Sequence, residues 1–287
     1  MKVTQDLSSL ESLYRRLPTD RLTGLSVALL KATALELAIL AGHLLLYPSG
    51  IAQERRPCTS PGPAEGASRL PSKERAPVVL LHGFMDNRSV FLLLRHSLGR
   101  QGRPRTESLN YSLLTTDIRA AAEIFGRQVE EICEHTGSTR VDVVGHSLGG
   151  LIARYYVQRL GGDERVRMLI TLGSPHSGTR VLPLADAHPI VRQMRPGSKV
   201  IEELARPAPG CRTEFVSFWS DLDHLMDPVE AARIDHPDLL AHNVQVTGIG
   251  HLALTVHPAV ASAVRQALDG TRAPAGTAVE GGGLTVA

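Results

Sequence analysis

The apolar positions of this chain fall into short continuous runs that alternate with longer segments of helical spacing. Continuous runs are typical of strands buried on both faces of a sheet, and they occur at residues 77–81, 140–144, 166–172, 214–219 and 243–247. Helical spacing covers residues 117–135, with Asp117 as capping residue, and residues 257–268, and another helix is expected from Ser147 to about Leu160. This alternation predicts an α/β fold, with a mostly parallel sheet and helices on both faces.

Residues 22–47 form a long apolar run ahead of the first predicted strand, interrupted by Lys31, Glu36 and His43. About 20 apolar residues are enough to cross a bilayer, but a charge near the centre of a span costs about 2.5–3.5 kcal/mol. The run predicts an apolar helix with three open interpretations: a membrane span, a helix on the membrane surface, or a helix packed on the following domain. A cleavable signal peptide is disfavoured, because the run is longer than the roughly 7–15 residues of a signal-peptide core.

The distribution of proline and glycine divides the chain into four regions. Residues 1–47 contain the apolar helix, and residues 48–76 are a linker too rich in proline and glycine for helix or sheet. Residues 77–269 hold the α/β domain, and residues 270–287 are expected to be a disordered tail. The apolar run favours a membrane-associated or extracellular location, while a cytoplasmic location stays open.

Composition narrows the functional classes only in part. The net charge of +2 and the lack of a basic stripe interleaved with aromatics give no reason to expect a nucleic-acid partner. The three cysteines, Cys58, Cys133 and Cys211, are too few for a disulfide framework and lack metal-ligand spacing. A single disulfide between Cys58 and Cys211 stays open for an exported chain, and neither a metal nor a cofactor is expected.

The strongest chemical signal is the pentapeptide Gly145-His146-Ser147-Leu148-Gly149, which lies between a predicted strand and a predicted helix. A serine at such a sharp turn has a strained backbone and an exposed hydroxyl, and the flanking glycines let the turn close. The helix N-terminus favours the negative charge that develops in acyl transfer. The pattern also fits a plain glycine-rich turn, but its strand–turn–helix setting favours Ser147 as a nucleophile.

A second signal is the tripeptide His82-Gly83-Phe84, which follows the first predicted strand of the α/β domain. The backbone N–H of Phe84 would complete an oxyanion hole together with the N–H of Leu148, the residue after the serine. The alternative is a tight turn with His82 as a packed core residue. A nearby candidate nucleophile favours the oxyanion hole.

A nucleophilic serine needs a histidine as general base and a carboxylate that orients this histidine, and both are expected downstream of the serine. His251 directly follows the last predicted strand and is preferred to His257, which precedes a proline at a helix start. The loop after the preceding strand offers Asp223 as the acid. Asp221 is the second choice, and Asp227, before a proline, is more plausible as a turn residue.

As an ordered set, five segments resemble bacterial triacylglycerol lipases and esterases of the α/β-hydrolase superfamily: VVLLHGF, RVDVVGHSLGG, LITLGSPHSGT, FWSDLDHLM and GIGHLAL. The resemblance covers roughly residues 76–268 and leaves out the apolar run and the linker. It implies an α/β-hydrolase fold, a triad of Ser147, Asp223 and His251, and oxyanion donors at Phe84 and Leu148. It implies no metal, because the calcium site of some larger lipases has no counterpart in this sequence.

These features predict a lipase or esterase that cleaves carboxylic esters through an acyl-enzyme. Residues 174–212 carry enough apolar positions for one or two amphipathic helices, which either cover the site or pack beside it. Together with the apolar run, they favour medium or long acyl esters, with a lipid or ester as substrate and a membrane surface as partner. An acyltransferase or thioesterase would use the same triad, and a non-enzymatic, membrane-tethered scaffold is the remaining alternative.

Overall fold

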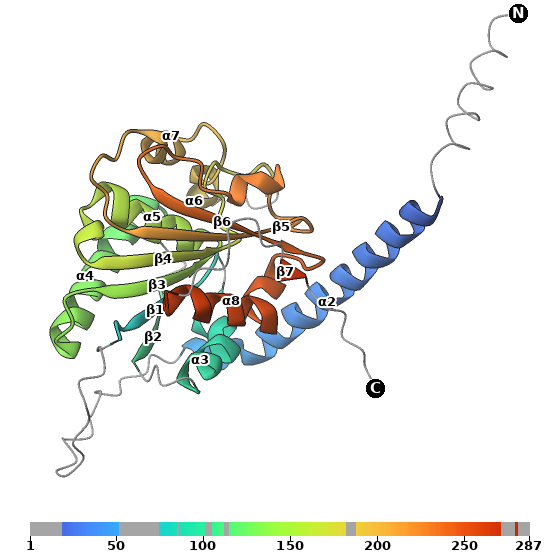
Figure 1. Ribbon diagram of the computed structural model, residues 1–287, viewed down its shortest axis with the longest axis horizontal. Coiled ribbons are helices and arrows are strands. Elements are labelled where there is room, and N and C mark those ends of the chain that lie inside the picture. Colours follow the sequence, from blue (N-terminus) through green and yellow to red (C-terminus); the bar gives the residue numbers. More distant parts are fainter. Residues whose placement is uncertain are drawn as a thin grey trace, which may run out of the picture.

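The computed structural model describes residues 19–51, 75–84, 86–100, 105–111, 115–181, 188–270 and 279–280. Within these residues one sheet of seven parallel strands has the order β2-β1-β3-β4-β5-β6-β7, with helices on both faces (Figure 1). The strands are β1 (Val78–Leu81), β2 (Thr106–Leu109), β3 (Val141–His146), β4 (Val166–Leu172), β5 (Glu214–Ser220), β6 (Leu240–Thr247) and β7 (Val279–Glu280).

The helices divide between the two faces of the sheet. The α-helices are α2 (Thr19–Ile51), α3 (Leu92–Gly99), α4 (Ile118–Thr136), α5 (Leu148–Arg159), α6 (Pro189–Gln193), α7 (Lys199–Ala205) and α8 (Pro258–Leu268). Short 3-10 helices are η1 (Arg88–Phe91), η2 (Gly162–Glu164), η4 (Val229–Ala232) and η5 (Leu252–Thr255). Helices α4 to α7 pack into the core on one face, whereas α3 and α8 pack into the core on the other.

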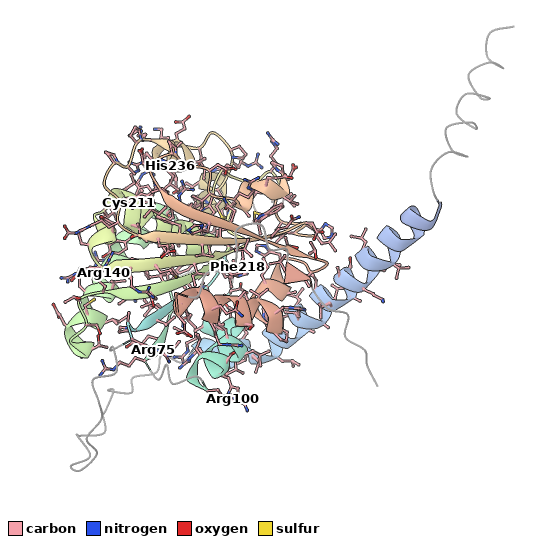
Figure 2. All side chains as sticks on the ribbon, in the orientation of Figure 1. Arg75, Arg100, Arg140, Cys211, Phe218 and His236 are labelled. Atoms are coloured by element: carbon pink, nitrogen blue, oxygen red, sulfur yellow. The ribbon has the colours of Figure 1, made fainter. Side chains whose placement is uncertain are left out.

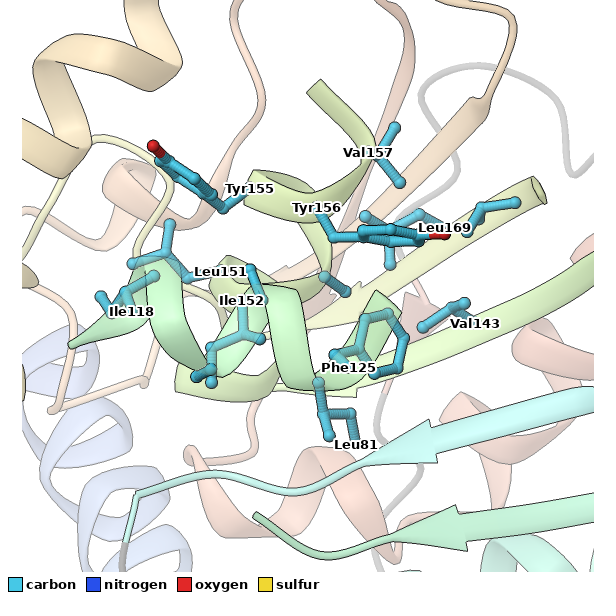
Figure 3. Packing of buried hydrophobic residues seen from close by; sticks show 14 of the residues in the cluster. Leu81, Ile118, Phe125, Val143, Leu151, Ile152, Tyr155, Tyr156, Val157 and Leu169 are labelled. Atoms are coloured by element: carbon cyan, nitrogen blue, oxygen red, sulfur yellow. The ribbon is translucent and has the colours of Figure 1, made fainter. Parts of the chain in front are cut away.

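Each core uses alternate residues of the central strands. Val143 of β3 packs with Phe125 of α4 and Leu151 of α5 (Figure 3), whereas its neighbour Val144 belongs to the opposite core. Because β1 and β3 to β5 have helices on both sides, nearly all of their side chains are buried. One of these buried side chains is Phe218 of β5, which is labelled in Figure 2. Each such apolar side chain contributes about 1.5–3 kcal/mol relative to an exposed one. This burial is why these strands appear in the sequence as continuous apolar runs.

The predicted α/β fold and its main elements are confirmed. Strands β1 and β3 to β6 and helices α4, α5 and α8 all occur where the apolar pattern predicts them. Asp117 caps α4 as expected, since its Oδ1 accepts hydrogen bonds from the N–H groups of Arg119 and Ala120 at 2.7 and 3.2 Å. Helix α3 and strand β2 were not predicted; β2 has the polar sequence TESL and is half-buried at the edge of the described sheet.

The apolar N-terminal run is helical, and its helix α2 extends beyond the predicted limits to Thr19 and Ile51. The expected linker therefore begins later than residue 48, because side chains of the α/β domain bind the last carbonyl groups of the helix. The Nδ2 groups of Asn87 and Asn110 donate to the backbone oxygens of Tyr47 and Gly50, each at 2.9 Å. Residues 52–74 of the linker lie outside the described part.

The C-terminal tail differs from its prediction at two residues. Val279 and Glu280 form β7 and pair in parallel with β6, so a fully disordered tail is wrong at this point. The apolar pattern does not predict this strand, because a strand of two residues forms only by hydrogen bonding to the edge of an existing sheet. The other tail residues after Gly270 lie outside the described part of the chain. Cys58 also lies outside it, so a disulfide between Cys58 and Cys211 stays a prediction.

Candidate active site

Ser147 occupies a sharp turn between β3 and α5. Its backbone φ of 51° and ψ of −122° make it the one non-glycine residue with positive φ in the described part of the chain. The turn closes because glycines flank it: a Cβ on Gly149 would lie 2.2 Å from the backbone oxygen of Leu81. A Cβ on Gly145 would lie 2.5 Å from the Cα of Gly150. Such strain at a single serine is a feature of functional sites.

The two predicted oxyanion donors lie on either side of this serine. Leu148 is the first residue of α5, where helix geometry provides no internal acceptor for the N–H group. Phe84 follows Gly83, which lies directly against the serine: a Cβ on Gly83 would approach the Cβ of Ser147 to 3.2 Å. Both backbone groups therefore lie at the turn that carries the serine hydroxyl.

Tyr111 orients the peptide bond that carries the N–H of Phe84, a role that sequence reasoning missed. The Tyr111 hydroxyl donates to the backbone oxygen of Gly83 at 2.8 Å, and His82 Nδ1 donates to the same oxygen at 2.8 Å. The two rings also stack at 4.4 Å. Since C=O and N–H point in opposite directions in a trans peptide, fixing the oxygen of Gly83 fixes the direction of the Phe84 N–H.

The pKa values of Tyr111 and His82 keep both side chains in uncharged forms that can donate a hydrogen bond. Burial, with the nearby charge of Asp86, holds the pKa of Tyr111 well above its usual range, so its hydroxyl keeps its proton. Burial also lowers the pKa of His82, which therefore stays neutral. Tyr111 follows strand β2 in no recognisable motif, so only the folded structure reveals its contact.

His251 and Asp223 form a buried pair. His251 Nδ1 donates to Asp223 Oδ2 at 2.7 Å, which leaves the Nε2 atom of the ring as the acceptor. Burial disfavours the charged imidazole, but the charge and hydrogen bond of Asp223 and the charges of Glu36 and Asp86 outweigh it, so the pKa of His251 is raised. Gly173 makes room for the pair, since a Cβ there would lie 2.9 Å from Asp223 Oδ2.

The competing sequence candidates occupy other positions. Asp221 Oδ1 accepts a hydrogen bond from the N–H of Gly248 at 3.0 Å, and Asp227 lies exposed before a proline. His257 caps α8, where its Nδ1 accepts from Ala259 N at 3.3 Å. Among the three aspartates of the loop, Asp223 is the one that is hydrogen-bonded to His251.

The histidine loop and the serine turn meet through His146. The ring centroid of His146, the residue before Ser147, lies 4.7 Å from that of His251. His146 Nδ1 also lies 3.6 Å from Asp86 Oδ2. The five predicted site residues thus come from loops that gather at the carboxyl edge of the sheet, where ligands bind in α/β proteins.

Glu36 of helix α2 binds the loop that carries His251. Its two carboxylate oxygens accept hydrogen bonds from the N–H groups of Leu252 and Ala253, each at 2.9 Å. The contact leaves so little room that a Cβ on Gly250 would lie 2.5 Å from the Glu36 carboxyl carbon. From the sequence alone, Glu36 is only an interruption of the apolar run, because the residues that Glu36 binds are more than 200 positions away.

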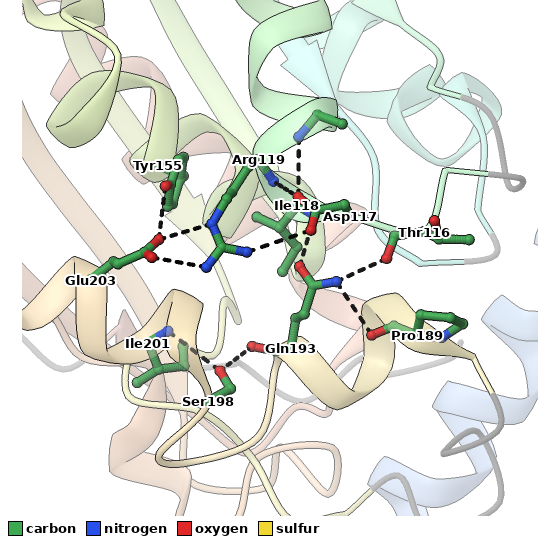
Figure 4. Close-up of polar contacts among 11 residues, drawn as sticks. Thr116, Asp117, Ile118, Arg119, Tyr155, Pro189, Gln193, Ser198, Ile201 and Glu203 are labelled. Atoms are coloured by element: carbon green, nitrogen blue, oxygen red, sulfur yellow. Dashed lines mark hydrogen bonds and ion pairs between the residues drawn. The ribbon is translucent and has the colours of Figure 1, made fainter.

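The segment 174–212 packs on the domain through α6 and α7. Ile190, Val191, Met194, Val200, Ile201 and Leu204 are buried in the core formed with α4 and α5. Arg119 of α4 donates two hydrogen bonds to Glu203 at 3.0 and 2.9 Å, and the Tyr155 hydroxyl donates to Glu203 at 2.8 Å (Figure 4). Gln193 Nε2 donates to the oxygen of Thr116 at 2.8 Å. These contacts favour the packed-helix interpretation; residues 182–187 lie outside the described part.

No cluster of three or more His, Cys, Asp or Glu side chains is placed to hold a metal ion within the described residues. The absence of a metal and of a cofactor stays a prediction.

Comparison with known proteins relates this chain to a family of hydrolases. The family model of palmitoyl protein thioesterase matches residues 77–225. A palmitoyl-protein thioesterase–dolichyl pyrophosphate phosphatase fusion protein of Schizosaccharomyces pombe is 32% identical over 39% of this chain and 19% of its own length. A triacylglycerol lipase of Burkholderia plantarii is 27% identical over 41% of this chain and 34% of its own. The match therefore spans a fifth to a third of these relatives.

A solved structure extends the likeness to the fold of the domain. The mature lipase BlEst2 of Bacillus licheniformis superimposes with a TM-score of 0.57 at 15% identity, over 71% of this chain and 96% of the lipase. At this identity the likeness concerns the fold alone.

Proposed function

Because the chain belongs to the palmitoyl protein thioesterase family and has the fold of lipases and esterases, we propose that it is a serine hydrolase that cleaves medium or long acyl esters through an acyl-enzyme. Its family and relatives make it a hydrolase; the proposal concerns its catalytic residues and its substrate. The observation that carries the proposal is the 2.7 Å hydrogen bond between His251 and Asp223, with the His251 ring 4.7 Å from that of His146, the neighbour of the strained Ser147.

The proposed reaction begins with attack of Ser147 Oγ on the acyl carbonyl carbon, while His251 Nε2 takes the hydroxyl proton. Asp223 holds the imidazole in the tautomer whose Nε2 is free to accept, and stabilises the imidazolium that forms. The N–H groups of Phe84 and Leu148 stabilise the oxyanion, and each such donor contributes about 2.7–4 kcal/mol. His251 then protonates the leaving group, and water, activated by the same histidine, releases the acid.

A thioester is the second candidate substrate, and the family model favours it. The same five groups would act on a thioester, because the acyl carbon and its oxyanion are alike in both substrates and only the leaving atom differs. The lipase relative favours an oxygen ester instead. The acyl group is common to both substrates, so we propose acyl transfer to water. Experiment decides whether the leaving group is an alcohol or a thiol.

A membrane surface is the proposed partner. Residues Leu29–Gly50 of α2 form an apolar stretch of 22 residues with mean hydropathy 1.7, in which few side chains are buried. A stretch this apolar and this exposed supports a membrane-associated location for the enzyme.

The test uses the purified full chain and the Ser147→Ala variant. Hydrolysis of p-nitrophenyl esters from acetyl to palmitoyl is compared with hydrolysis of palmitoyl-coenzyme A. We expect activity that rises with acyl length and falls by roughly 10⁶-fold in the variant. Preference for the thioester would select the second candidate. A folded protein that cleaves neither class would refute the proposal.

A further inference from the structure

Two polar groups of helix α2 face the catalytic domain. Glu36 binds the two N–H groups that follow His251, at 2.9 Å each. About two turns later, the His43 ring is also buried against the domain, and burial lowers its pKa, so that it stays uncharged. Two of the three polar interruptions of the apolar run, Glu36 and His43, thus contact the domain, whereas Lys31 is exposed.

The C-terminal end of α2 makes further polar contacts with the domain. Asn87 and Asn110 bind the carbonyl groups of Tyr47 and Gly50. From the buried Ala32 to Gly50 the docked length is about 27 Å, at 1.5 Å per residue. Figure 1 shows α2 running beside the domain, with its N-terminal end extending past it.

A helix docked in this way does not cross a bilayer. If residues 32–50 spanned the hydrocarbon layer, the polar loops bound to them would have to enter it as well, with their charged and hydrogen-bonding groups. The geometry therefore separates the three interpretations of the apolar run. A membrane span conflicts with the docking, whereas a helix lying flat is compatible with it.

The opposite face of α2 is apolar and exposed. Leu30, Leu37 and Leu44 repeat every seven residues and have exposed fractions of 70%, 61% and 65%. The same helix also exposes Val27, Leu29, Leu40, Leu45 and Leu46. Leu92 and Leu93 at the start of α3, directly after η1, which contacts α2, are exposed as well. We call the side of α2 that carries Val27, Leu30, Leu37, Leu44 and Leu45 the apolar face.

The chemistry of the apolar face points to lipid. Protein interfaces of comparable size have a polar rim with hydrogen-bonding groups, whereas between Leu29 and Gly50 the one exposed charge is Lys31. A lysine on a helix that lies at a membrane surface reaches the headgroup region with its long side chain and is attracted by anionic lipids. Large exposed apolar patches of this kind mark membrane-binding surfaces.

We propose that α2 is a membrane-docking helix that lies in the plane of a bilayer, with the apolar face in the headgroup–acyl boundary and the opposite face bound to the active-site loops. Helix α2 contacts η5, which begins directly after His251, and η1, which begins four residues after Phe84. The docked helix therefore holds the catalytic edge at the lipid surface. Resting on the proposed function, this assigns as substrate an acyl ester or thioester that resides in the bilayer.

The first test is flotation of the full chain with vesicles of phosphatidylcholine and phosphatidylglycerol. The variant Leu30→Glu/Leu37→Glu/Leu44→Glu should lose at least about tenfold in vesicle binding, because three leucines that would enter the lipid become charged. The matched control, Leu160→Glu/Leu240→Glu, changes exposed leucines outside the apolar face and should bind as the wild type does. Equal flotation of both variants would overturn the proposal.

Activity on soluble p-nitrophenyl butyrate, compared with activity on an ester held in vesicles, distinguishes the docking role of α2 from the proposed hydrolase activity. The triple variant should hydrolyse it at the wild-type rate, while its rate on a palmitoyl ester held in vesicles falls at least about tenfold, as its binding does. A wild-type chain that binds vesicles but cleaves neither the p-nitrophenyl esters nor palmitoyl-coenzyme A would refute the hydrolase and leave the docking helix standing. A triple variant with full activity on vesicle-borne ester would refute the docking helix alone.

The second test measures orientation. In a Trp219→Phe background, Leu30→Trp, Leu37→Trp and Leu44→Trp each place one tryptophan on the apolar face, over about 21 Å of helix. Quenching by lipids brominated at different acyl positions should give the three tryptophans the same shallow depth, roughly 5–10 Å into the boundary. A steady gradient of depth from residue 30 to residue 44 would show a span and overturn the proposal.

Discussion

At the residue scale, the site depends on a few backbone groups whose directions are set by side chains outside the motifs. The oxygen of Gly83 receives hydrogen bonds from Tyr111 and His82, and the N–H groups after His251 are bound by Glu36. Neither contact changes the reacting atoms. Both hold a peptide bond in place before the substrate arrives, which is how preorganised sites stabilise developing charge.

The Tyr111→Phe variant should lower kcat on soluble esters by roughly 10- to 100-fold, since a small displacement of an oxyanion donor is costly. The KM should change little, because the hydroxyl contacts the backbone and not the substrate. Tyr156→Phe, which removes a hydroxyl in the α4–α5 core, is the matched control and should keep full activity. A Tyr111→Phe enzyme with wild-type kcat would contradict the positioning role.

The Glu36→Gln variant should move the acidic limb of the pH–rate profile. The base must be neutral to act, so activity rises as pH passes the pKa of His251, which Glu36 helps to raise. Removing this charge lowers that pKa, and the limb moves to lower pH. Glu202→Gln, an exposed carboxylate on α7, should leave the profile unchanged. An unmoved limb in Glu36→Gln would show that the carboxylate acts only as a structural contact.

At the element scale, the periodicity of the sequence was sufficient for the fully buried strands and the amphipathic helices. Strand β4 was predicted to the residue, because both of its faces are covered and its seven positions are nearly all apolar. Strand β2 escaped prediction because its polar TESL sequence is only half-buried. The roles of α6 and α7 were left open, since a lid and a packed helix have the same amphipathic pattern.

The ion pair between Arg119 and Glu203 tests whether α7 is part of the core. Glu203→Ala removes the acceptor of Arg119 and of the Tyr155 hydroxyl, and should lower the free energy of unfolding by about 1.5–3 kcal/mol. Urea denaturation measures this change, with the exposed Glu202→Ala as control. If α7 were a detachable cover, Glu203→Ala would leave the stability as it is and alter long-chain activity instead.

At the scale of the whole molecule, the sequence predicted the family resemblance and the fold, and it named five site residues that the structure gathers at one edge of the sheet. It left open how the apolar run relates to that edge. The reason is physical: a charge inside an apolar helix has the same appearance in sequence whether it is buried in lipid, exposed, or bound to a distant loop. The contact of Glu36 with Leu252 and Ala253 in the folded structure is what our proposal of a docked helix rests on.

The same contact gives α2 a place in the enzyme. One side of α2 contacts the loop that carries His251 and the other side is exposed, so in our proposal one helix connects a lipid surface with the proposed base. Such an enzyme would take its acyl substrate from the phase in which long acyl chains reside.

The most direct measurement traps the acyl-enzyme. The full chain is mixed with a p-nitrophenyl palmitate or palmitoyl-coenzyme A substrate, quenched in acid within a single turnover, and its peptides are analysed by mass spectrometry. We predict a palmitoyl group on Ser147, absent in Ser147→Ala and in His251→Ala. An acyl group on another residue, or product formed by Ser147→Ala at the wild-type rate, would show that Ser147 is not the nucleophile.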